Sequence, residues 1–358
     1  MPAAAKELTR GMPIEIGNIN RSLTQLWEQE GTNMVKASLV NFAVYSEAAD
    51  ALTYNTRLME EITREHACRI ILLAVNPAAQ KHRVQAWISA HCHLSGSGDR
   101  EVCSEQIAFL LEGMGPETMR NVLFSHLDSD LPLYLWWQGQ FSGTLDPQLW
   151  SWVDRFIFDS YSWREPTRQI RILRESVAGT GSRCVLCDLN WRRLIYLRLA
   201  IAQMFDQPWA TGKLREIREV SIVYHPEYRT TAVLLAAWLA GQLGWRLEKA
   251  LDAEFRFSPP GSIDPVVLKL TAVPGEWIGE VQLRFADGSE FNLNWSGKFL
   301  ESGCSDFQGV KQLLPAGGTT IADLVNEELM RGGEHRSYLR ALGLAERLWG
   351  VGNGGGDQ

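Results

Sequence analysis

The sequence predicts an α/β protein of two domains: an N-terminal domain with a mostly parallel sheet flanked by helices, and a C-terminal mixed α/β domain. Its 358 residues exceed the usual size of one domain. In the first half, short apolar runs that fit buried strands alternate with amphipathic stretches that fit helices, which favours parallel strands joined through helices. In the second half, two alternating runs around Asp287-Gly288 favour an antiparallel hairpin.

The N-terminal elements follow from local periodicity. Strands are predicted where apolar residues alternate or run continuously, and helices where they recur every three or four residues. In chain order we expect a flexible arm over 1–20, a helix at 22–29, a strand at 36–45, a helix at 46–62, strands at 69–75, 82–93 and 101–111, a helix from Pro116, a strand at 131–137, and a helix over 146–156 followed by extended chain to 160.

A stretch with Gly179, Gly181 and Ser182 separates the two halves. It places the N-terminal domain at 21–176, a linker at 177–187, the C-terminal domain at 188–349 and a disordered tail at 350–358. Within the C-terminal domain we expect helices at 191–205, 230–244 and 319–344, a strand at 220–224, and hairpin strands at 281–285 and 291–295 joined by a type I′ turn. The antiparallel hairpin predicts a mixed sheet.

Composition argues against several classes of protein. The formal charge of −7 and the absence of a Lys/Arg run argue against nucleic-acid binding, which depends on phosphate contacts. No apolar stretch is long enough to cross a membrane, and residues 1–13 lack the pattern of a signal peptide. Six cysteines are a low density that fits a reducing compartment. We expect a soluble cytoplasmic protein that binds neither nucleic acid nor membrane.

Motifs for catalysis and cofactor binding are missing. The G-x-x-x-x-G-K-[ST] and G-x-S-x-G patterns are absent, and G-x-G-x-x-G occurs only in the glycine-rich tail, where no helix can follow it. Residues of metal-ligand type occur at His66, Cys68, His91, Cys92 and His93. On a strand, His91 and His93 share a face while Cys92 points the other way, so convergence on one ion is not indicated. We expect no cofactor and no metal.

Two features leave other functions open. Cys184 and Cys187 form a lone C-x-x-C, which is either a redox pair or two unrelated thiols near a domain junction. Asp154, Asp159 and Asp188 neighbour apolar sequence, but they show no catalytic spacing and can equally be held by arginines or backbone donors. The alternatives are an α/β enzyme acting on a sugar phosphate and a thiol-switched regulator.

Tryptophan is in excess. The chain has 14, roughly three times average usage. Trp is enriched at interface hot spots, although an individual Trp more often belongs to the core. We interpret the excess as contact surface for another protein. Trp163, Trp209, Tyr224 and Trp295 are predicted partner contacts, whereas at least one of Trp136 and Trp137, on opposite faces of a predicted strand, should be core.

Four segments carry a distinctive order of residues. They are 65–71 (EHACRII), 131–137 (LPLYLWW) with 154–160 (DRFIFDS), 188–194 (DLNWRRL) continuing to 202–206, and 324–342. This series resembles the glucose-6-phosphate dehydrogenase assembly protein family, often called OpcA. The chain departs from the family at Ala67-Cys68, where Pro and a small residue are commoner. The matching motif positions are His66, Arg69, Trp136, Trp137, Asp159, Ser160, Asp188, Trp191 and Arg193.

The resemblance implies a bacterial protein without catalytic activity of its own. It would bind glucose-6-phosphate dehydrogenase and promote its active oligomer in the oxidative pentose phosphate pathway. Some photosynthetic relatives are linked to redox control through cysteines, which makes Cys184, Cys187 and Cys304 candidates here. The missing catalytic motifs and the surplus Trp agree with a protein-binding role.

Overall fold

The computed structural model describes residues 11–29, 34–94, 101–143, 145–178, 184–206, 210, 212–251, 253–305, 312–317, 320–333 and 336–350. Two compact units divide the chain, and neither is one continuous segment. Unit 1 comprises Met1–Asp159, Ile172–Cys187 and Thr320–Gly333, and unit 2 comprises Ser160–Arg171, Asp188–Thr319 and Glu334–Gln358. The two domains predicted as contiguous therefore exchange the segments 160–171 and 320–333.

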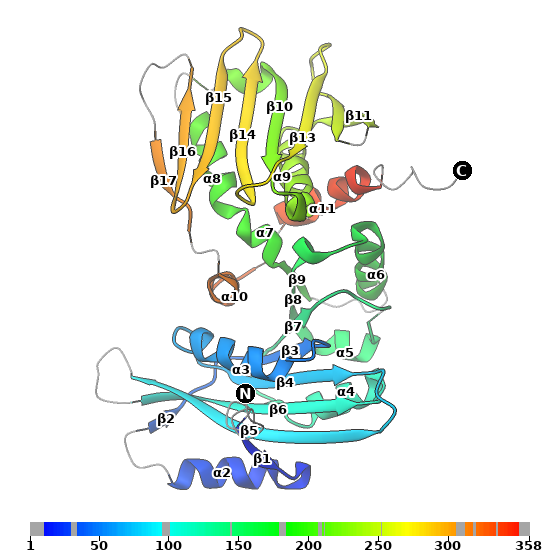
Figure 1. Ribbon diagram of the computed structural model, residues 1–358, viewed down its shortest axis with the longest axis vertical. Coiled ribbons are helices and arrows are strands. Elements are labelled where there is room, and N and C mark those ends of the chain that lie inside the picture. Colours follow the sequence, from blue (N-terminus) through cyan, green and yellow to red (C-terminus); the bar gives the residue numbers. More distant parts are fainter. Residues whose placement is uncertain are drawn as a thin grey trace. The chain divides into compact units, whose positions relative to one another are not determined.

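Unit 1 is built on a nine-stranded sheet (Figure 1). The strands follow the order β1-β5-β6-β4-β3-β7-β8-β9, with β2 paired to β6. Pairs among β2, β3, β4, β6, β7 and β8 are parallel, whereas β5–β6 and β1–β5 are antiparallel. The strands are β1 Met12–Ile14, β2 Met34–Lys36, β3 Asn41–Ser46, β4 Arg69–Asn76, β5 Arg83–Leu94, β6 Glu101–Glu112, β7 Leu133–Gln138, β8 Val153–Phe158 and β9 Val185–Asp188.

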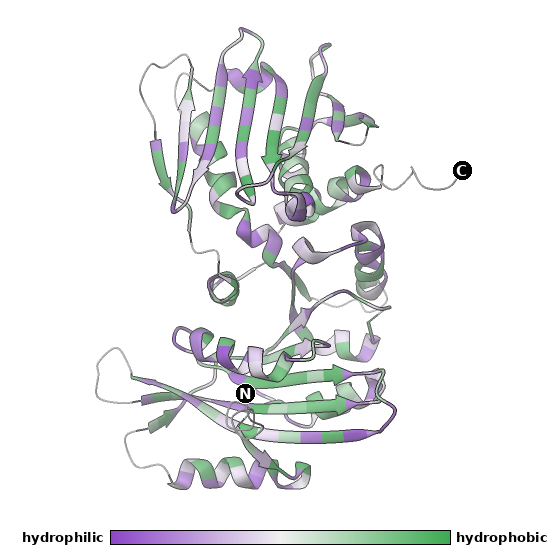
Figure 2. Cartoon of the chain, viewed as in Figure 1, coloured by the Kyte–Doolittle hydropathy of each residue, from purple (hydrophilic) through white to green (hydrophobic). Residues whose placement is uncertain are grey.

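The helices of unit 1 lie on both faces of this sheet. Neighbouring residues of β6 show this, because Gln106 donates to Thr56 of α3 while Glu105, which points the other way, accepts from Trp27 of α2. Central strands such as β4 are consequently mostly apolar (Figure 2). Every residue of β3 is buried. The helices are α2 Ile19–Gln29, α3 Ala51–Ile62, α4 Pro116–Phe124, α5 Pro147–Trp152, α6 Pro166–Ala178, which the unit boundary divides, and α10 Ile321–Leu329, with the 3-10 turn η1 Ile16–Asn18.

The parallel core of unit 1 is doubly wound. Along the sheet, β6-β4-β3-β7-β8-β9 have the sequence order 3-2-1-4-5-6, which is the order of a Rossmann sheet. The chain moves from β3 toward β4 on one side and later to β7 on the other. A crevice for ligands is therefore expected where β3 and β7 end.

Unit 2 is built on an eight-stranded mixed sheet in the order β11-β12-β13-β10-β14-β15-β16-β17. Only β10–β13 is parallel among its strand pairs in the described residues. Helices α8 and α9 lie along one face (Figure 1). The strands are β10 Ile217–Tyr224, β11 Arg246–Leu251, β12 Glu254–Ser258, β13 Val266–Ala272, β14 Ile278–Phe285, β15 Glu290–Ser296, β16 Phe299–Cys304 and β17 Gln312–Pro315.

The helices of unit 2 complete its apolar core. α9 is buried along eleven consecutive residues, Thr230 to Ala240, because α11 packs against it on the side away from the sheet. The helical elements are η2 Ser160–Ser162, α7 Leu189–Arg193, α8 Ile195–Phe205, η3 Lys213–Arg215, η4 Pro226–Tyr228, α9 Arg229–Gln242 and α11 Arg336–Trp349. No helix in the described part of the chain is long and apolar enough to span a membrane.

The mostly parallel first sheet and the mixed second sheet confirm the predicted fold class. The hairpin of β14 and β15 is present, but its turn differs from the prediction. Gly288 N donates to the carbonyl of Phe285 at 3.1 Å, and Phe285 N donates to Ser289 O at 2.9 Å, so the loop has three residues. Gly288 has φ +86°, which fits the left-handed position that ends a three-residue loop rather than a type I′ turn at Asp287-Gly288.

Four other predicted boundaries were wrong. The helix expected over 319–344 is two helices, because the chain turns at Gly332-Gly333, where Gly333 has φ +81°. The helix expected to reach 156 ends at Trp152, and the β-branched and aromatic residues after it form β8. The predicted arm contains β1, which pairs with β5. The predicted linker contains β9, a strand of the first sheet.

Candidate functional site

Both tryptophans of the Trp136-Trp137 motif are core residues of unit 1. They are 3% and 7% exposed and point to opposite faces of β7. Trp136 stacks with Phe42 and Trp137 stacks with Tyr45, both on β3. These two positions stabilise the central strand pair, and their burial leaves little surface for a partner.

Arg69 compensates a buried carboxylate. Glu105 is fully buried on β6, where it forms ion pairs with Arg69 and with Lys36 at 2.9 Å and accepts a hydrogen bond from Trp27 Nε1 at 3.2 Å. Arg69 Nε also donates to the carbonyl of His126 at 2.7 Å. A buried charge requires such partners, and through them Glu105 links β6 to β2, β4 and α2, with Arg69 as its partner on β4.

His66 lies just before β4 and faces α10. Burial lowers its pKa, while a hydrogen bond with the backbone of Asn326 partly offsets that effect. The motif residue thereby links the start of β4 to the helix that returns to unit 1 near the end of the chain.

Asp159 is half-buried at the end of the first segment of unit 1, and the other motif positions meet in unit 2 around Asp188. Its Oδ1 accepts from Ser160 N at 3.0 Å and from Asn190 N at 2.9 Å, and its Oδ2 accepts from Ser160 Oγ at 2.6 Å and from Tyr338 OH at 3.1 Å. Trp191 packs against Tyr338, with ring centroids 5.6 Å apart. Because Asp188 is 2% exposed and saturated with donors, it serves structure here.

This network extends to the surface through Asn190. The side-chain amide of Asn190 makes three hydrogen bonds. Its Nδ2 donates to Ser160 Oγ at 3.0 Å, and its Oδ1 accepts from Thr231 Oγ1 at 2.7 Å and from Arg193 at 3.4 Å. The Arg193 guanidinium lies over the ring of Tyr161, 5.2 Å from its centroid. The motif residues Ser160, Asp188 and Arg193 therefore fix the position of Tyr161.

Tyr161 begins an aromatic cluster on unit 2. It stacks with Tyr228 at 4.8 Å, and Tyr228 contacts His225 at 6.2 Å and Trp277 at 6.3 Å. Trp277 in turn packs edge-on against Trp295 at 5.0 Å. We call this set the aromatic cluster; its members are Tyr161, Arg193, His225, Tyr228, Trp277 and Trp295.

The aromatic cluster lies where β10 ends and α9 begins. The start of β14 and the end of β15 lie at the same edge of the sheet, since both strands are antiparallel to their neighbours. Every member is half-buried. Trp, Tyr and Arg are the residues most enriched at interface hot spots, and a partly exposed cluster of them is the arrangement that a protein partner can cover.

The residues predicted as partner contacts differ in their exposure in the structure. Trp295 is in the aromatic cluster. Trp163 and Tyr224 are 4% and 6% exposed, so the expectation that they lie on the surface was wrong. Tyr224 is on the core face of β10, and Trp163 follows η2 into the interior. Trp209 lies outside the described residues. Sequence reasoning missed Tyr161, His225, Tyr228 and Trp277; the position of His225 and Tyr228 directly after a strand was the available signal.

The Cys184–Cys187 pair does not form a disulfide. Cys187 is fully buried beside Arg155 and Glu328. Burial raises the pKa of Cys184 to about 12 and that of Cys187 well above its ordinary value. A reactive cysteine needs a depressed pKa, so these environments disfavour thiolate chemistry.

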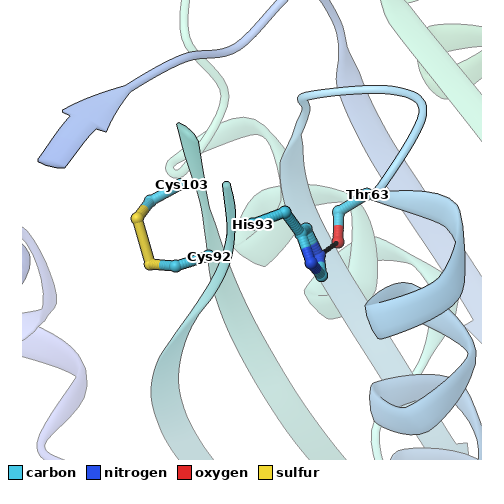
Figure 3. Close-up of a disulfide and its surroundings, with 4 residues drawn as sticks. All are labelled: Thr63, Cys92, His93 and Cys103. Carbon is cyan, nitrogen blue, oxygen red and sulfur yellow. Dashed lines mark hydrogen bonds between the residues drawn. A yellow bond between two sulfur atoms is a disulfide. The ribbon is translucent and has the colours of Figure 1, made fainter. Parts of the chain in front are cut away.

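A disulfide joins Cys92 of β5 to Cys103 of β6, directly opposite each other in the register (Figure 3). The low cysteine density predicts a reducing compartment, and this bonded pair stands against that prediction. His93 points to the other side of β5, where it contacts Thr63 at 3.0 Å. One group of three metal-ligand side chains, Cys92, Glu101 and Cys103, occurs in the described residues, and two of its sulfurs are bonded to each other.

The crevice at the end of β3 has unusual chemistry for a doubly wound sheet. The turn from β3 into α3 reads Ser46-Glu47-Ala48-Ala49-Asp50, without glycine and with two carboxylates. Glu47 accepts a hydrogen bond from Tyr45 OH at 2.5 Å. A pyrophosphate at this helix N-terminus would meet like charges, so the turn disfavours the phosphate binding that a glycine-rich turn supports.

Fold and surface together define a two-unit α/β protein with a doubly wound unit 1 and an aromatic cluster on unit 2. The family models described as glucose-6-phosphate dehydrogenase subunit N-terminal domain and C-terminal domain match residues 59–175 and 184–342. The chain belongs to this family, the OpcA family of glucose-6-phosphate dehydrogenase assembly proteins.

A curated relative, the OxPP cycle protein OpcA of Nostoc punctiforme, is 32% identical over 198 residues, which is 53% of this chain and 41% of the relative. The matched region thus spans less than half of that relative's length. Among solved structures, Gal80p of Saccharomyces cerevisiae (8% identity, TM-score 0.46, 88% of this chain and 95% of that one) and the WlbA dehydrogenase of Bordetella pertussis (12%, 0.41, 88% and 97%) are distantly similar.

Proposed function

We propose that this protein is a non-catalytic assembly factor that acts in the cytoplasm, binds glucose-6-phosphate dehydrogenase and promotes its active oligomer. The aromatic cluster of unit 2 supports this proposal most directly. It combines two Trp, two Tyr, a His and an Arg in one half-buried set, and buried hydrogen bonds to family-motif residues hold one end of it in place. Such a preorganised surface loses little side-chain entropy when a partner covers it.

An assembly factor without catalytic groups acts through differential affinity. It shifts the oligomer equilibrium of its partner only to the extent that it binds one assembly state more tightly than another. To convert a partner that is about 1% active oligomer into one that is about 99% active, the difference must reach about 5.5 kcal/mol. Two or three hot-spot side chains at about 2 kcal/mol each are of that size.

The test combines the full-length chain with its cognate dehydrogenase. We expect the wild-type protein to co-elute with the dehydrogenase in size-exclusion chromatography and to raise its specific activity and its mass. Trp277→Ala and Trp295→Ala should each raise the dissociation constant by about 30-fold, because each removes a large aromatic side chain from the aromatic cluster.

The matched control is Trp152→Ala in unit 1. Trp152 is 59% exposed and contacts Phe124 at 5.2 Å, so it is an exposed tryptophan outside the aromatic cluster. The Trp152→Ala variant should bind the dehydrogenase with a dissociation constant within about twofold of the wild-type value. Absence of any complex with folded wild-type protein would refute the assembly role; equal losses in all three variants would refute the aromatic cluster as its surface.

A further inference from the structure

A polar groove of about 750 Å³ lies on unit 1, away from the Rossmann crevice. Strand β5 lies beneath it, and α3 and the start of α10 form its sides. All of its lining residues belong to unit 1. We call it the α3–α10 groove, and its floor residues are Thr56, Ser89, His91 and Asn326.

A buried glutamine fixes the chemistry of the floor. Gln106 is fully buried, and its Nε2 donates to Thr56 Oγ1 at 3.1 Å and to Ser89 Oγ at 3.2 Å. Its Oε1 lies 2.9 Å from His91 Nε2. Because this amide oxygen can only accept, His91 Nε2 is the donor, and Nδ1 of a neutral imidazole is an acceptor. Burial lowers the pKa of His91, which favours the neutral ring.

The hydroxyls of Thr56 and Ser89 each accept from Gln106, so their protons remain available to donate. The floor therefore presents two hydroxyl donors beside one imidazole acceptor. Burying this many polar groups under a groove costs free energy compared with an apolar floor, unless the groups meet partners.

Asn326 of α10 supplies the independent sign of a ligand. It lines the groove and is 5% exposed, yet its Oδ1 has no hydrogen-bond partner among the described residues. An unsatisfied buried amide costs about 1–3 kcal/mol. The helix that carries it is held firmly, by the capping box of Thr320 and Asp323 and by the buried ion pair of Glu328 with Arg155 at 3.1 Å. The helix that carries the Asn326 amide is thus held in a fixed position beside the groove.

The rim of the groove carries charges of both signs. Arg57 and Arg64 face four carboxylates, those of Glu60, Glu61, Glu65 and Asp323. The excess of carboxylates disfavours a phosphate ester by like-charge repulsion. A purely cationic ligand would leave the Thr56 and Ser89 donors and both guanidinium groups unmatched. Hydroxyl groups donate and accept at once, and they match every group on floor and rim.

We propose that the α3–α10 groove binds a small neutral polyhydroxy compound, of the monosaccharide or oligosaccharide class. The volume lies within the usual range of small-molecule sites. This site is independent of the proposed assembly function, since it lies on unit 1 and shares no residue with the aromatic cluster.

The experiment titrates the full-length chain by calorimetry and by ligand-observed NMR with glucose and maltotriose, and in parallel with glucose 6-phosphate and spermidine. We expect saturable binding of a neutral sugar and weaker binding of the phosphate ester and the polyamine. No saturable binding of either neutral sugar, or preference for the phosphate ester or the polyamine, would overturn the proposal.

Two substitutions separate a ligand role from a structural one. Thr56→Val keeps the shape of the side chain, and Asn326→Leu removes the unsatisfied amide. Each should weaken sugar binding by about tenfold or more, while Asn326→Leu keeps or raises the melting temperature. Asn294→Leu, at an exposed site of unit 2, is the matched control and should bind normally. Unchanged sugar affinity in both groove variants would contradict the assignment.

Discussion

The two sheets of this protein differ in how many of their faces are covered by helices. The central strands of unit 1 are covered on both faces, so β3 and β4 are apolar in nearly every position. The strands of unit 2 alternate, as in β13, because helices cover one face. The opposite face carries a ladder of charges in which Lys269 pairs with Glu219 at 2.7 Å and Arg284 pairs with Glu290 at 2.8 Å.

This difference in coverage determines where polar and charged side chains can lie in each unit. In unit 1, polar side chains lie at strand ends, on β5 beneath the α3–α10 groove, and at Glu105 and Gln106 of the neighbouring strand β6. Charges deeper in unit 1 must be paired internally, as in Arg155–Glu328 and Arg69–Glu105. In unit 2, charges on the open face need no such pairing to remain stable, because water solvates them.

The largest expected effect breaks a buried pair of unit 1. Glu328→Gln leaves the charge of Arg155 buried without its carboxylate, so unit 1 should lose about 3–5 kcal/mol of stability. The loss of stability can be measured as faster amide hydrogen exchange in β6 of the variant than in β6 of the wild type. If β6 exchange changes no more than that of β14 in unit 2, the ion pair does not stabilise unit 1 in particular.

Acid should also weaken unit 1. His126 is buried beside Phe109, and burial together with the charge of Arg69 lowers its pKa to about 4. The unfolded chain takes up a proton near pH 6.5 that the folded chain refuses, so stability falls as the pH drops from about 6.5 to about 4, by up to about 3 kcal/mol. Denaturant titrations at several pH values across this range should show that the free energy of unfolding of His126→Leu depends less steeply on pH than that of the wild type. The exposed His82→Leu is the control and should keep the wild-type slope.

A smaller effect is expected at the buried network of unit 2. Tyr338→Phe removes one of the donors to Asp188 and leaves Ser160 and Asn190 in place, so the loss should be about 1–2 kcal/mol. Hydrogen exchange of α9 measures it. A loss as large as that of Glu328→Gln would mean that Asp188 depends on Tyr338 far more than its other donors suggest.

The smallest effect is expected on the open face of the second sheet. Lys269→Met removes an exposed partner of Glu219, and surface pairs of this kind contribute little, so the denaturation midpoint should stay within experimental error. A clear loss of stability would show that this face is less solvated than its alternating pattern indicates.

Periodicity was enough to predict the central strands of the first sheet and β10, β14 and β15 of the second, because a continuous apolar run such as Ile70–Leu73 and an alternating run such as Val281–Phe285 have distinct patterns. The other strands of the second sheet, β11, β12, β13, β16 and β17, were not predicted. It misplaced elements where a tertiary contact decides. Val153–Phe158 pairs with β7, and 321–329 packs in unit 1 although the apolar stripe continues toward 344.

The candidate surface was predictable only in part. Trp295 came from composition, but Tyr161, Tyr228 and Trp277 lie far apart in sequence and meet through folding. The α3–α10 groove left no motif, because Thr56, His91 and Asn326 have unremarkable spacing and Gln106 links the first two only in the folded sheet.

The interleaved course of the chain has a consequence for its synthesis. Unit 1 contains Thr320–Gly333, and α10 within it bears the glutamate that neutralises Arg155. Residues 188–319 of unit 2 leave the ribosome before that segment does. Arg155 of unit 1 therefore has no carboxylate partner until Glu328 has been synthesised, and a nascent chain stopped before residue 320 holds neither unit in finished form.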